Sequence, residues 1–183
     1  RMTWMKTAPT FVLSDDEAGY REFCERMMQQ FADTTVQAEA EALCKSCLLL
    51  PGAVDTSALP LEVFTDPLDQ GKTPIGLRGW FWAARALVAY RSGDMSLAST
   101  YTQQAFQSQP ALPARALTYS IAALERLGRG DFDGAREALG HATRMIDQNM
   151  FDAGANPLHD WGIALILARE SEKLLEAETA ARQ

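Results

Sequence analysis

Residues 80–147 read WFWAARALVAYRSGDMSLASTYTQQAFQSQPALPARALTYSIAALERLGRGDFDGAREALGHATRMID. This stretch decides the fold because it contains one helix-hairpin pattern twice, at an offset of 37 residues. The matched pairs are Trp82 and Tyr119, Ala86 and Ala123, Gly93 and Gly130, Asp94 and Asp131, Met95 and Phe132, Ala98 and Ala135, and Ala105 and Ala142. In each unit an aromatic residue begins the first helix, Gly-Asp makes the turn, and alanines let the second helix approach the first. One hairpin cannot bury its apolar face alone, so the pattern predicts stacked hairpins that share a core.

The remaining segments extend this pair into an all-α array with one domain over residues 15–177. Apolar residues at three- and four-residue spacing predict two helices before Pro51, the first of them capped by Ser14. Prolines and glycines predict an irregular connection before Trp80. The expected segments are an N-terminal arm (1–14), a degenerate hairpin (15–51), a connector (52–79), two repeats (80–110 and 114–147), a C-terminal capping helix (157–177) and a tail (178–183).

Composition narrows the classes of partner. The 183 residues are 47% hydrophobic and 22% charged, which is typical of a soluble globular domain. The formal charge of −7 opposes binding to nucleic acid and to anionic membranes, because both carry negative charge. No apolar run approaches the ~20 residues that a membrane span needs. We therefore expect a protein or peptide partner.

The cysteines and the first residue bear on cellular context. Three cysteines are an odd number, and Cys44 and Cys47 stand three apart in an expected helix, so a disulfide framework is not indicated. A reducing cytoplasm is the expected location. The chain begins with Arg1 and shows no basic-then-apolar signal segment, which leads us to expect a piece of a larger polypeptide.

The repeat pair resembles the tetratricopeptide family. Trp82 stands at the aromatic position, Ala86 at the small position of the first helix, Ala98 and Ala105 at the alanines of the second, and Pro110 at the terminal proline. The resemblance implies a right-handed, tetratricopeptide-like array of helical hairpins. It also implies a concave groove, lined by the first helix of each hairpin, in which a partner binds.

A closer resemblance covers roughly residues 20–175. Its motifs are CKSCLLLPGAVD at 44–55, WFW at 80–82, AYRSG at 89–93, PARA at 113–116 and HDW at 159–161. They look like the helical-repeat region C-terminal to the kinase domain of large planctomycete-type bacterial serine/threonine protein kinases. That resemblance implies an accessory region that recruits or positions partners. The kinase parts themselves, the glycine-rich loop, the strand lysine, the His-Arg-Asp loop and Asp-Phe-Gly, do not occur in the sequence.

Motifs that could carry chemistry have simpler structural explanations. Cys44-x-x-Cys47 lies late in its expected helix, where the helix dipole does not favour a thiolate, and a closed zinc site needs four ligands. His141 and His159 stand 18 residues apart with no nucleophile motif near them. Residues 128–131, Gly-Arg-Gly-Asp, join two helices and read as a tight turn. We expect a protein that is not an enzyme, with no catalytic residues, bound metal or cofactor.

The expected partner-binding face lies on the first helices of the two repeats. Its residues are Trp80, Ala83, Leu87, Arg91, Leu117, Ser120 and Leu124. A tryptophan close to an arginine is typical of an interface hot spot. Whether this groove is open or covered by the arm or the connector stays undecided from the sequence.

The leading hypothesis is a noncatalytic protein–protein interaction scaffold, an accessory region of a larger bacterial signalling protein. One alternative is a thiol-based redox or metal-responsive domain that uses Cys24, Cys44 and Cys47. The other is a homo-oligomerisation module that uses the same apolar face.

Overall fold

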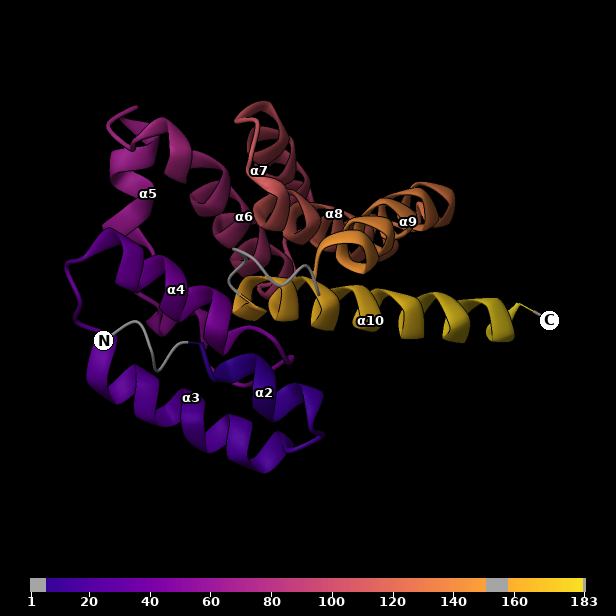
Figure 1. Cartoon of the computed structure of the whole chain (residues 1–183), viewed down its shortest axis with the longest axis horizontal. Helices are drawn as coiled ribbons and strands as arrows, with labels where there is room; N and C mark the ends of the chain where they lie inside the picture. Colours follow the sequence, from indigo (N-terminus) through magenta and orange to yellow (C-terminus); the bar gives the residue numbers. More distant parts are fainter. Residues whose placement is uncertain (1–5, 151–157, 183) are drawn as a thin grey trace.

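The structure is a computed structural model, and it describes residues 6–150 and 158–182 (Figure 1). Every regular element within these ranges is helical, which confirms the all-α prediction. The helices are α2 (Ala8–Leu13), α3 (Glu17–Phe31), α4 (Gln37–Cys47), α5 (Glu62–Asp69), α6 (Ile75–Arg91), α7 (Met95–Gln107), α8 (Leu112–Gly128), α9 (Phe132–Asn149) and α10 (Leu158–Ala181), with a 3-10 turn at Thr56–Ala58. None of the described helices is long and apolar enough to cross a bilayer.

Two helical hairpins, α6–α7 and α8–α9, form where the sequence repeats, and α8 packs against both helices of the first hairpin. Gly93 and Gly130 have φ values of +83° and +78°, a left-handed conformation that glycine adopts without strain, so each turn can be short. Asp94 and Asp131 then cap the second helices, each accepting a hydrogen bond from the backbone N–H three residues later, at 2.9 and 3.0 Å. The matched alanines Ala86, Ala98, Ala105, Ala123, Ala135 and Ala142 are all fully buried.

The N-terminal region differs from the expectation in two places. Residues 8–13 of the expected arm form helix α2, with Pro9 in its first turn, where its missing N–H costs no helical bond. Residues 1–5 of that arm lie outside the described residues. Asp16, rather than Ser14, caps α3, because its carboxylate accepts the Gly19 N–H at 2.9 Å. Ser14 instead donates its hydroxyl to the Thr10 carbonyl at 2.8 Å and closes α2.

The expected connector is partly helical. It contains α5, and α6 begins at Ile75, five residues before the expected start at Trp80. Gly76 and Gly79, two of the glycines from which an irregular connection is expected, lie inside α6. Gly79 has a packing role inside the helix, because a Cβ there would lie 2.6 Å from the Cβ of Pro110. Close packing between α6 and the α7–α8 link therefore overrides the low helix propensity of glycine.

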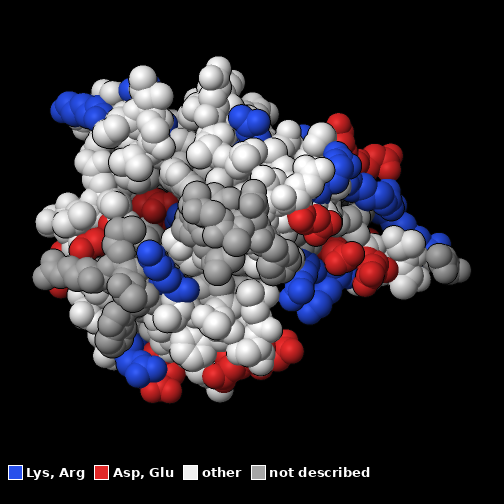
Figure 2. All heavy atoms as spheres, in the orientation of Figure 1, with Lys and Arg blue, Asp and Glu red and all other residues white. Residues whose placement is uncertain are grey.

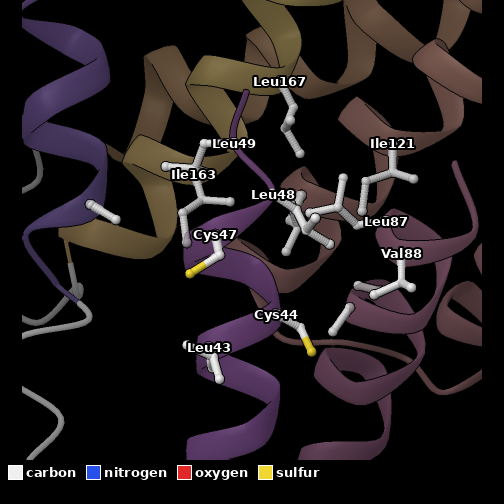
Figure 3. Close-up of a cluster of buried hydrophobic side chains, with 14 of the residues drawn as sticks. Leu43, Cys44, Cys47, Leu48, Leu49, Leu87, Val88, Ile121, Ile163 and Leu167 are labelled. Atoms are coloured by element: carbon white, nitrogen blue, oxygen red, sulfur yellow. The ribbon is translucent and has the colours of Figure 1, made fainter. Parts of the chain in front are cut away.

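Helix α10 crosses the hairpins and joins them to the N-terminal region. It packs against α8, α9 and α2, and Figure 1 shows its C-terminal part extending past α9. It ends at Ala181, four residues beyond the expected end at 177, while Pro157 lies outside the described residues. Figure 3 shows the core that results, where side chains of Leu48, Leu87, Ile121 and Leu167 converge from four parts of the chain.

Candidate functional site

The partner-binding face expected from the sequence is mostly interior. Ala83, Leu87, Leu117, Ser120 and Leu124 have no exposed surface, whereas Trp80 is partly exposed. The Ser120 hydroxyl donates to the Ala164 carbonyl of α10 at 2.9 Å. Most of the expected partner-binding face is therefore covered, a point that the sequence left undecided. Helix α4 packs on α6 and α10 packs on α8, and these leucines and alanines are apolar enough to need such packing partners.

Arg91, also expected on the partner-binding face, holds these helices together. Its guanidinium forms a bidentate pair with Glu170 of α10, with both N–O distances at 2.6 Å. The same group donates to the carbonyls of Leu48 and Leu49 at 2.9 Å. Only 4% of the side chain is exposed, so Arg91 is not available to a partner. Self-association through this face would also require α10 to leave it.

Trp80 keeps a place on a different hollow, which we call the Trp80–Trp82 groove. The groove has a volume of about 730 Å³ and lies among the end of α5, the first half of α6, the end of α7 and the α7–α8 link. Its lining residues are Leu68, Gly71, Ile75, Gly76, Arg78, Gly79, Trp80, Trp82, Gln104, Gln107, Ser108, Gln109, Pro110 and Ala111. On the face drawn in Figure 2, acidic and basic side chains gather around α9 and the C-terminal part of α10, while the surface over α5 to α7 carries few charges.

Both tryptophan rings of the groove are held by cations. The Lys45 ammonium lies 4.2 Å from the centroid of the Trp80 ring. Trp82 stacks on Tyr101 with centroids 5.6 Å apart, and the Arg85 guanidinium lies 5.3 Å from the Trp82 ring. Cations at such distances from aromatic faces are attracted by the ring quadrupole. The two indole rings are thus restrained before any ligand arrives, which lowers the entropy cost of binding.

The rim of the groove offers neutral hydrogen-bonding groups. Gln104 and Gln107 share one side of α7, and Gln109 follows in the link. Within the described ranges, none of these three side-chain amides has an intramolecular partner, so each can donate and accept. Arg78, the one charged residue among the described residues of the lining, already donates to the carbonyls of Thr73 and Gly71 at 2.9 and 3.1 Å.

A buried ion cluster supports the Trp80 side of the groove. Lys45 contacts Glu41 at 2.7 Å and Asp160 at 3.2 Å, and all three side chains are less than 10% exposed. Burial raises the pKa of the Glu41 carboxyl, although Lys45 partly offsets this effect. Burial lowers the pKa of Lys45, but the nearby carboxylates of Glu41 and Asp160 outweigh it, so that the net shift is upward. None of these three residues lines the groove. The carboxylates of Glu41 and Asp160 hold the Lys45 ammonium in its place over the Trp80 ring.

The two histidines lie in separate surroundings. His159, at the start of α10, lies 3.4 Å from the Asp160 carboxylate, and burial lowers its pKa. His141 of α9 stacks on Tyr119 with ring centroids 4.8 Å apart. Neither residue lines the Trp80–Trp82 groove.

The three cysteines are buried side chains of the N-terminal helices. Figure 3 shows the sulfur atoms of Cys44 and Cys47 on different sides of α4, and the Cys47 thiol is hydrogen-bonded to Cys24 of α3. That bond lowers the pKa of Cys24 and raises the pKa of Cys47, while burial raises the pKa of Cys44. None of the three has exposed surface. Within residues 6–150 and 158–182, no group of three or more His, Cys, Asp or Glu side chains is placed to hold a metal ion.

Of the residues that line the Trp80–Trp82 groove, only Trp80 was expected from the sequence to bind a partner. Trp82, which stands at the aromatic position of the repeat, also lines the groove. A signal was present in Gln104 and Gln107, which are neutral, polar and three residues apart on one helix. Comparison of the chain with protein-family models, with curated proteins and with solved structures finds no match.

Proposed function

We propose that this chain is a noncatalytic protein-interaction module that binds a peptide segment in the Trp80–Trp82 groove. The observation that carries the proposal is the pair of half-buried tryptophan rings, each restrained by a cation, beside glutamine amides that have no intramolecular partner. Tryptophan side chains supply a large part of the binding energy at protein interfaces. Amides next to them can bond to the backbone of an extended peptide.

The preferred ligand in this proposal is uncharged and extended, and proline-rich segments fit this description best. A polyproline helix lacks internal hydrogen bonds, so its carbonyls are free to accept from glutamine amides. Grooves lined by aromatic residues recognise such segments because the helix is preformed. Among the described lining residues Arg78 alone is charged, and it already donates to two backbone carbonyls, so the lining suits an uncharged peptide better than a strongly charged one.

The scaffold in this proposal is a right-handed, tetratricopeptide-like array closed by α10. The repeated Gly-Asp turns and buried alanines of α6–α9 support it, as does the sequence resemblance to the tetratricopeptide family. We further propose that the module is an accessory region of a cytoplasmic bacterial signalling protein, on the strength of the motifs at 44–55 and 80–93. The proposed site lies at the outer end of α6 and not on the face that α10 covers.

The test is selection of peptides from a random displayed library, followed by titration of the best binders. Replacing Gln104 and Gln107 together by alanine should weaken binding about thirtyfold, because two hydrogen bonds of roughly 1 kcal/mol each are lost. Gln103→Ala is the matched control, since this exposed residue of α7 does not line the groove. Failure to select any peptide, or equal binding by the double variant and the control, would refute the proposal.

A further inference from the structure

A second hollow lies between α2 and α10, the first and last described helices, and shares no residue with the Trp80–Trp82 groove. It has a volume of about 360 Å³ and is formed by the end of α2, the turn after α4 and the middle of α10. Figure 1 shows α2 and α10 lying beside one another at this place, where the two helices pack together. We call it the α2–α10 pocket. Its lining residues are Val12, Leu13, Asp15, Leu49, Leu50, Pro51, Ile166, Arg169, Glu170, Lys173 and Leu174.

Apolar side chains from all three segments line this pocket. Leu13 comes from α2, Leu50 from the turn, and Ile166 and Leu174 from α10. Leu174 is 41% exposed and lies in the C-terminal half of α10, where most side chains are exposed. An apolar ligand in the pocket would remove this surface from water.

The pocket is lined by two basic and two acidic side chains, and these differ in whether they already have an ion-pair partner. Glu170 is neutralised by its bidentate pair with Arg91. Arg169 and Lys173 are exposed, stand four residues apart on one side of α10, and have no ion-pair partner among the described residues. Asp15 is the one acidic group of the lining that is not already paired in this way. The rim is therefore locally cationic, although the whole chain carries a formal charge of −7.

We propose that the α2–α10 pocket binds a medium-chain fatty carboxylate, with its aliphatic chain on the apolar lining and its carboxylate between Arg169 and Lys173. The volume lies near the lower end of the range for small-molecule sites, which suits one slender chain better than a folded partner. The two cations on successive turns match a single anionic head. The pocket joins α2 to α10, so an occupied pocket would add contacts between the two ends of the chain.

The test is calorimetric titration of the full chain with decanoate below its micelle-forming concentration, with amide chemical shifts to locate the site. Decanoate should saturate one site and shift resonances of α2 and α10. The double variant Arg169→Glu/Lys173→Glu should bind about tenfold more weakly, because two exposed ion pairs are lost. Asp15→Asn should bind more tightly, since it removes a like charge, and asparagine tolerates the positive φ of 58° at this position. Leu174→Gln should weaken binding, because it removes apolar surface that contacts the aliphatic chain of decanoate.

The matched control for charge is Arg26→Glu/Lys72→Glu, two exposed residues outside the pocket, and this variant should bind as the wild type does. Helical signal and urea denaturation check that every variant remains folded. No saturable binding of decanoate, shifts confined to other helices, or equal loss in the control would overturn the assignment. Equal affinity for uncharged decanol would overturn the role of the cations. Since the Gln104→Ala/Gln107→Ala variant leaves this pocket intact, decanoate binding and peptide binding succeed or fail independently.

Discussion

Replacing Lys45 by methionine removes the cation of the buried cluster while keeping a side chain of similar length. The substitution leaves Glu41 and Asp160, each with 9% of its side chain exposed, without their shared counter-ion. Loss of one partner from a buried ion pair typically costs 3–5 kcal/mol, because the remaining charge stays desolvated, and we take about 4 kcal/mol here. For a domain of this size each kcal/mol lowers Tm by roughly 2–4 °C, so Tm should fall by about 12 °C.

The assay is urea denaturation followed by the helical circular-dichroism signal, together with thermal scans. The triple variant Glu41→Gln/Lys45→Met/Asp160→Asn should recover most of the loss, to within about 1–2 kcal/mol of the wild type, because no buried charge remains. Lys72→Met is the control, since Lys72 is exposed and should change stability by less than about 0.5 kcal/mol.

The Lys45→Met variant should also respond to pH in a defined direction. Burial already raises the pKa of Glu41 above its ordinary value of 4.5, and loss of the ammonium raises it further. A carboxyl with a raised folded-state pKa binds its proton more tightly in the folded state than in the unfolded state. The stability deficit should therefore be full at neutral pH and shrink as pH falls through that raised value toward 4.5. The reasoning would be refuted if Lys45→Met were nearly as stable as the wild type, or if the triple variant were as unstable as Lys45→Met alone.

Three further predictions follow from individual contacts. Ser120→Ala should lower the free energy of unfolding by about 1 kcal/mol in urea denaturation, because the bond to the Ala164 carbonyl is lost; no change would mean that this bond adds nothing to α10 docking. Gly79→Ala should cost about 1–2 kcal/mol in the same assay, since its Cβ would lie 2.6 Å from that of Pro110, whereas a gain would show that the link yields easily. All three fully buried thiols should resist Ellman's reagent in the native protein and react after unfolding, and rapid native reaction would revive the thiol-based alternative.

The repeated hairpins follow from the sequence because their signals are local. Gly93 and Gly130 need only their own backbone conformation to make the turns, and Asp94 and Asp131 cap helices through an N–H three residues away. Periodicity in apolar residues likewise predicted the helices, but it did not show that the face carrying Leu87 and Leu124 is interior. The positions of the connector helix α5 and of the start of α6 did not follow, because packing of Gly79 against Pro110 joins residues far apart in the chain.

The sequence by itself determined that the chain is helical and that residues 80–147 pair into two hairpins, but it left undecided whether the face carrying Leu87 and Leu124 is open or covered. Only the tertiary structure decided what covers it. Periodicity states that a face is apolar, but any apolar surface can satisfy it, and the choice of α4 and α10 rests on long-range contacts such as the pair between Arg91 and Glu170. Because α4 and α10 cover that face, the candidate site lies instead at the first half of α6, on surface that stays exposed after the helices have packed.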